Sequence, residues 1–180
     1  MTATTSKHAL AASALACGLA LSLGACDGGR EYTVPPEACG VPVGEKALDP
    51  FLVDGKELKV LGKPLATSKG NCAIWVDEWL VVNLRLEKVD KLYDPMDESE
   101  EFRFKNRAKV KDVPFGGLGA VGDFNAMVST ECAAPDAKFV IAYVEISLES
   151  SGDVTRRREN IESFALDFVP KAKKTLGCTA

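Results

Sequence analysis

Histidine is almost absent from this chain of 180 residues, and its single copy, His8, lies among the first twenty-five residues. If those residues are removed during export, for reasons given below, the mature chain has no imidazole. That absence excludes a Ser-His-Asp triad, a Cys-His pair and a histidine-ligated metal. The exported part also contains neither a GxSxG motif nor an SxxK dyad, which are common around catalytic serines. We therefore expect no enzyme, no catalytic residue and no cofactor.

A surplus of basic residues is also missing. Without Lys7 the chain carries 21 Lys and Arg against 26 Asp and Glu, a net charge near −5. Nucleic-acid-binding domains usually present a basic surface, so we expect no nucleic acid partner. Hydrophobic residues make up 46% and charged residues 27%, which is typical of a packed core and excludes disorder by composition.

A long apolar run is absent as well, although a short one follows Lys7. Residues 9–25 are uncharged and rich in Ala and Leu, but about seventeen weakly hydrophobic residues fall short of the roughly twenty that a spanning helix needs. A positive charge, a short apolar run and small residues at its end are typical of an export signal. A short membrane-anchoring helix is the alternative interpretation.

The run ends in Leu23-Gly24-Ala25-Cys26, which resembles the lipobox of bacterial lipoproteins. This resemblance implies a signal peptide over 1–25, cleavage between Ala25 and Cys26, and acyl chains such as palmitate carried by Cys26. Two or three acyl chains hold a protein on a membrane almost permanently, at about 0.8 kcal/mol for each buried methylene. We expect residues 26–38, which contain two Gly and two Pro, to form a lipidated flexible tether at the extracytoplasmic face of the cell membrane.

Four cysteines follow the lipobox, namely Cys39, Cys72, Cys132 and Cys178. An even number is typical of an oxidising compartment. Their spacings of 33, 60 and 46 residues match no zinc pattern, and no CxxC pair exists for redox chemistry, so we expect no metal. Three pairings exist, and we favour Cys39–Cys72 with Cys132–Cys178 because each disulfide then closes one half of the chain.

Two pairs of strand-like segments and one helix-like segment predict the fold. The hairpins are predicted over 71–76 with 79–88, and over 126–132 with 139–148. After Gly152 the apolar positions follow a period of 3.6 residues, which predicts an amphipathic helix ending at Gly177. We expect residues 39–180 to form a single disulfide-stapled α+β domain. Its antiparallel sheet is built from the two hairpins, with the C-terminal helix packed on one face and the N-terminal segment on the other.

The first hairpin turns at Asp77-Glu78, and a two-residue turn fixes the pairing of its strands. Under this pairing one face of the hairpin carries Val82, Leu84 and Leu86. The other face carries Cys72, Ile74 and Val76. A disulfide from Cys72 to Cys39 would hold the N-terminal segment over that second face.

Three further patterns each have a structural and a functional interpretation. Gly117–Gly122 matches the dinucleotide-binding pattern GxGxxG, but strand-like residues follow it where a helix is needed, so we interpret it as a loop or bulge. The acidic residues of 94–101 lack the spacing and central glycine of an EF-hand and indicate a solvated loop or helix start. Arg156-Arg157-Arg158 could meet anionic lipid, but its position favours a solvated turn that opens the helix.

These segments together resemble the small actinobacterial lipoproteins of unknown function that carry two disulfides. The resemblance rests on the lipobox, Cys39-Gly40-Val41-Pro42, the strand over 71–77, Glu131-Cys132 and Leu176-Gly177-Cys178. It implies an α+β layout like that of PsbP-like lipoproteins and brings no catalytic residues with it.

Two functions are compatible with these observations. The first is a binding or interaction module of the cell envelope, whose partners are the membrane, through the lipid on Cys26, and an unidentified envelope protein or ligand. The alternative is a histidine-free hydrolase of envelope glycans. That enzyme would need a cleft with two inward carboxyl groups roughly 5–9.5 Å apart.

Overall fold

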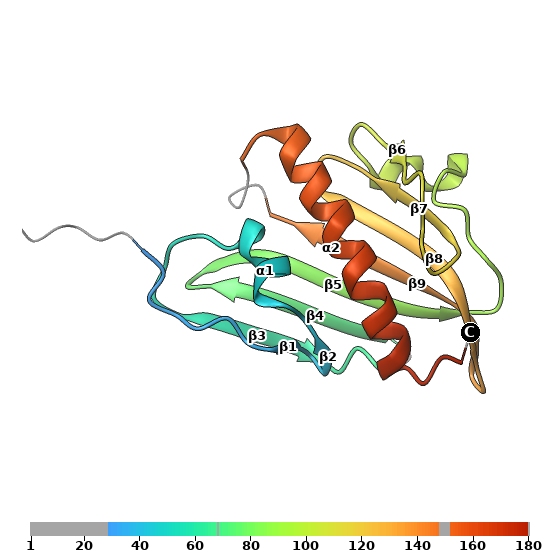
Figure 1. The fold of residues 1–180 in the computed structure, drawn as a ribbon, viewed down its shortest axis with the longest axis horizontal. Helices are drawn as coiled ribbons and strands as arrows, with labels where there is room; N and C mark the ends of the chain where they lie inside the picture. The colour runs from blue at the N-terminus through green and yellow to red at the C-terminus, as the bar shows by residue number, and fades with distance from the viewer. Residues whose placement is uncertain (1–28, 68, 148–151, 180) are drawn as a thin grey trace, which may run out of the picture.

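A seven-stranded antiparallel sheet forms the centre of the computed structural model, which describes residues 29–67, 69–147 and 152–179 (Figure 1). The strands lie in the order β3-β4-β5-β9-β8-β7-β6. Their bounds are β3 (Leu58–Lys63), β4 (Lys69–Val76), β5 (Trp79–Val89), β6 (Ala108–Lys109), β7 (Leu118–Val121), β8 (Asn125–Ala134) and β9 (Ala137–Ile146). One long helix, α2 (Val154–Thr175), crosses one face of the sheet.

The two predicted hairpins are confirmed as β4–β5 and β8–β9, and they lie side by side through the pairing of β5 with β9. The sheet then extends to β3 at one edge and to β7 and β6 at the other. β7 lies inside the GxGxxG segment, which was expected to be a loop or bulge. Gly117 explains the strand: its φ is +125°, and a Cβ there would lie 2.4 Å from the Ser129 carbonyl oxygen, so only glycine allows this close approach to β8.

The pairing inside the first hairpin differs from the prediction because β5 contains an extra residue. The residue pairing expected for a two-residue turn holds as far as Trp75 and Leu80, but Ile74 then pairs with Val82 instead of Val81. Val81 is therefore the inserted residue of a β-bulge, which moves every later side chain of β5 to the other face. The bulge brings onto one buried face the residues that were expected on two, namely Cys72, Ile74, Val76, Val82, Leu84 and Leu86.

Helix α2 buries the face that its periodicity predicts. Its start is capped by Asp153, whose carboxylate accepts a hydrogen bond from the Arg156 backbone N–H, and Gly177 follows its end with a φ of +74°. The side chains in contact with the core are at most 2% exposed and include Ile161, Phe164, Phe168 and Ala172. Burial of these apolar side chains is the main force that holds the helix on the sheet.

The N-terminal segment lies on the same face as α2, not on the opposite face as expected. It contains β1 (Glu37–Ala38), β2 (Val41–Pro42), α1 (Glu45–Leu48) and a 3-10 helix, η1 (Asp49–Phe51). Both β2 and α1 contact α2, as Figure 1 shows. The bulge explains the difference, because it places Val82, Leu84 and Leu86 on the same face as Cys72, where the disulfide to Cys39 holds the segment.

Residues 29–38, expected as part of a free tether, are instead held against the domain. The Arg30 backbone forms an isolated parallel β-bridge with Gly55. Its guanidinium binds the Asp49 carboxylate and donates to the Leu52 carbonyl at 2.8 Å. The Tyr32 hydroxyl donates to the Val53 carbonyl at 2.5 Å, and burial raises the pKa of this phenol. Within the described part of the chain, contacts with the domain therefore start at Arg30.

The opposite face of the sheet is covered over β8 and β9 by residues 90–107. There a second small core forms from Met127, Ile141 and Tyr143, packed against Val89, Tyr93 and Phe104. The segment contains a 3-10 helix, η2 (Glu98–Arg103), whose N-cap Asp97 accepts a hydrogen bond from the Ser99 N–H. The acidic stretch is thus a loop and helix start, as predicted.

Both favoured disulfides are present. Cys39–Cys72 has a Cα–Cα distance of 5.8 Å and ties the N-terminal segment to β4. Cys132–Cys178 has a Cα–Cα distance of 4.5 Å and ties the end of α2 to β8. Each bond closes a loop within one half of the chain.

Replacing both Cys132 and Cys178 with serine should lower the free energy of unfolding by about 3 kcal/mol, because the loop of 46 residues regains its freedom in the unfolded chain. Urea unfolding of the variant and the parent measures this difference. In the variant, peptide mapping without reductant should still recover the Cys39–Cys72 link. Equal unfolding midpoints would show that the second disulfide does not stabilise the fold.

Candidate functional site

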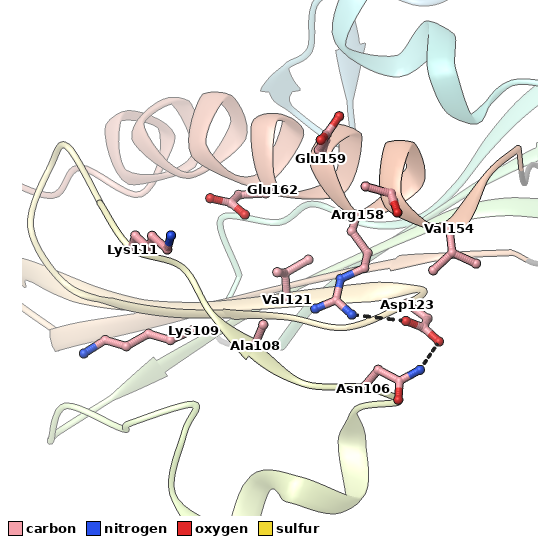
Figure 2. Close-up of a pocket in the computed structure, with 11 residues that line it drawn as sticks. Asn106, Ala108, Lys109, Lys111, Val121, Asp123, Val154, Arg158, Glu159 and Glu162 are labelled. Carbon is pink, nitrogen blue, oxygen red and sulfur yellow. Dashed lines mark hydrogen bonds and ion pairs between the residues drawn. The ribbon is translucent and has the colours of Figure 1, made fainter.

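The candidate site is a cleft of about 470 Å³ between the first turns of α2 and the β6–β7 edge of the sheet (Figure 2). Helix α2 supplies one wall of the cleft. The opposite wall and the floor come from β6, β7 and the residues beside them. Its lining residues are Asn106, Ala108, Lys109, Lys111, Val121, Asp123, Val154, Thr155, Arg158, Glu159 and Glu162.

Asp123 forms the base of this cleft and is the most buried charge in it. Its side chain is 4% exposed, so its carboxylate needs partners that replace water. The Asn106 amide donates to Oδ2 at 2.8 Å, and the Arg158 guanidinium lies 3.3 Å from Oδ1. These contacts join the β7–β8 turn, the segment before β6 and the start of α2. Asp123 therefore acts as a structural link among these three segments.

Arg157 strengthens the same junction from the other side. It is 6% exposed, and its Nε donates to the Asp123 carbonyl at 2.7 Å while Nη1 donates to the Gly152 carbonyl at 3.1 Å. Its guanidinium also lies over the Phe124 ring, 4.2 Å from the ring centroid. Arg157 is thus a buried packing residue, whereas the arginine run was expected to be a solvated turn.

The mouth of the cleft carries four charged side chains that form no salt bridge with the described part of the chain. Lys109 and Lys111 lie on the sheet side, and Glu159 and Glu162 lie on the helix side, with Lys111 and Glu162 facing the opening from opposite walls (Figure 2). Among the described residues, no salt bridge uses any of these four side chains. The cleft can therefore pair with a ligand that carries both positive and negative groups.

The carboxylates of the cleft lie in unequal positions. Glu159 and Glu162 are three residues apart on one helix and so project from the same wall. Asp123 at the base is already bound by Arg158 and Asn106. A glycosidase places its two carboxyl groups on either side of the scissile bond, and this cleft has no free pair on facing walls among the described residues.

Some of the predicted site residues lie within the described part of the chain and others do not. Ala25, Cys26 and the predicted signal peptide over 1–25 lie outside the described residues. Cys39, Cys72, Cys132 and Cys178 form two disulfides, and none of them lines the cleft. Within the described residues, no group of three His, Cys, Asp or Glu side chains could hold a metal ion. No described helix is long and apolar enough to cross a bilayer.

Sequence reasoning missed Asp123, Lys109 and Glu162 as members of one site. They come from separate elements that only the folded sheet brings together. The signal that could have pointed to the site was Asp123 itself, a charge set among apolar strand residues after the glycine-rich segment. A charge in such a position is usually paired, but the sequence does not single out Arg158 as the partner, because several lysines and arginines lie closer to Asp123 along the chain.

Comparisons with protein families, with curated proteins and with solved structures found no match for this chain.

Proposed function

We propose that the protein is a lipid-anchored binding module at the extracytoplasmic face of the cell membrane, and that it binds a charged envelope ligand or protein in the cleft beside α2. The lipobox at Cys26 supports the anchor, and the two disulfides support a location in an oxidising compartment. The observation that carries the binding proposal is the open cleft in which Lys109, Lys111, Glu159 and Glu162 have no partners within the described protein. The same-wall placement of Glu159 and Glu162 favours binding over glycan hydrolysis.

A photo-crosslinking residue at position 111 in intact cells tests this proposal. We expect one defined adduct, because Lys111 stands at the opening of the cleft. Charge reversal of the facing walls, Lys109→Glu with Glu162→Lys, should reduce the adduct about tenfold, since like charges would then oppose the ligand.

The matched control places the same residue at position 138, an exposed lysine on β9 that does not line the cleft. It should give no adduct of the same mass. An adduct that forms equally from both positions, or that the charge reversal leaves unchanged, would show that the cleft does not bind the captured partner.

A further inference from the structure

The first described residues and an exposed tryptophan lie at the same end of the molecule. Arg30 bridges Gly55, and the neighbouring Lys56 and Glu57 backbone N–H groups donate to the Asp77 carboxylate at 3.1 and 2.9 Å. Asp77 lies in the β4–β5 turn, and Trp79 follows it with 57% of its surface exposed. In Figure 1 the β4–β5 turn and the N-terminal part of the described chain lie at the same end, opposite the C-terminus.

The apolar surface at this end extends beyond Trp79. A shallow hollow of about 590 Å³ is lined there by Trp79, Leu80, Phe124 and Ile146. Two polar side chains, Asn83 and Glu145, also line the hollow and bind each other, since the Asn83 amide donates to the Glu145 carboxylate at 2.8 Å. Trp79 is thus a large aromatic side chain at the edge of an apolar hollow, in which Asn83 and Glu145 already hydrogen-bond to each other.

The chain between Cys26 and Arg30 is too short to let this end move far from a membrane. Four residues span at most about 14 Å when fully extended. By contrast, β5 has 11 residues and runs about 33 Å from Trp79 to Val89 at the far end of the sheet. A lipid on Cys26 therefore keeps the Trp79 end within reach of the bilayer while the far end can point away from it.

We infer that the Trp79 end rests on the bilayer, with the indole in the headgroup region; this inference depends on the proposed lipid anchor at Cys26. Tryptophan suits that region because its ring is apolar and its N–H can hydrogen-bond to water or headgroups. Exposed charges at this end have both signs, including Asp54, Lys56 and Glu78. The contact should therefore depend on the indole and hardly on the fraction of anionic lipid.

Fluorescence of the lipidated full-length mature protein in vesicles tests the inference. The chain has two tryptophans, so Trp75→Phe leaves Trp79 as the only one. Vesicles of phosphatidylcholine with bromine near the glycerol end of the acyl chains should quench Trp79 emission by about half, relative to unbrominated vesicles. The matched control combines Trp75→Phe and Trp79→Phe with Phe139→Trp, which places the indole at the far end of the sheet beside Val89. Its emission should change by less than about a tenth.

The mass of the N-terminal peptide, measured on the same samples, separates the two proposals. A peptide with lipid on Cys26 together with unquenched Trp79 emission would overturn the bilayer contact and leave the anchor in place; a protein partner or a second copy would then be the occupant of this end. Equal quenching at positions 79 and 139 would overturn the end-on orientation. A peptide without lipid on Cys26 would overturn the anchor and the bilayer contact together.

Discussion

Phe164→Ala is expected to lower the free energy of unfolding by about 4 kcal/mol, since it empties the centre of the core. Phe164 is 2% exposed, and its ring lies 5.7 Å from the ring of Phe51 in an edge-to-face arrangement and 5.7 Å from that of Phe168 in a stack. The side chain thus joins α2, η1 and the sheet, so the remaining groups cannot easily close the cavity. Urea unfolding followed by tryptophan fluorescence measures the loss.

The same substitution at an exposed position provides the control. Phe102 is 77% exposed, so Phe102→Ala should change the free energy of unfolding by less than about 0.5 kcal/mol. If the two variants lost similar stability, or if Phe164→Ala lost less than about 1 kcal/mol, the packing of α2 on this face would be wrong.

Cys26→Ala should abolish acylation completely, because it removes the proposed attachment site and the cleavage signal at once. Growth with a fatty-acid analogue should label the parent protein and give no label in the variant. The matched control is Cys17→Ala, a change inside the signal peptide that leaves the lipobox intact and should keep full labelling. Membrane fractionation alone does not decide the matter, since uncleaved precursor can stay bound through residues 9–25. Equal labelling of the Cys26→Ala variant and its parent would refute the lipoprotein assignment.

The elements that depend on local patterns were predictable from the sequence. The 3.6-residue period placed Ile161, Phe164 and Phe168 on the buried face of α2, and strand-forming residues located both hairpins. Of the three possible disulfide pairings, the favoured one is confirmed, because bonds between consecutive cysteines suit a chain with one hairpin in each half.

The remaining features depend on contacts between distant residues. The bulge at Val81 has no local signature, yet it reversed the face of β5 and with it the side on which the N-terminal segment packs. The strands β6 and β7 are short, with bounds of two and four residues, and are specified mainly by pairing with β8 and with each other. The cleft could not be predicted for the same reason, since Asp123 and Arg158 are 35 residues apart in the chain.

The order of the disulfides bears on how the protein matures. A chain that crosses a membrane N-terminus first presents Cys39 and Cys72 to an oxidase before Cys132 has emerged, and Cys178 appears last. Joining cysteines in their order of arrival therefore produces the native bonds directly. Reshuffling of wrongly paired disulfides takes seconds to hours and needs an isomerase to be fast. Consecutive connectivity makes that step unnecessary, so an oxidase alone should suffice to form both disulfides after the proposed export.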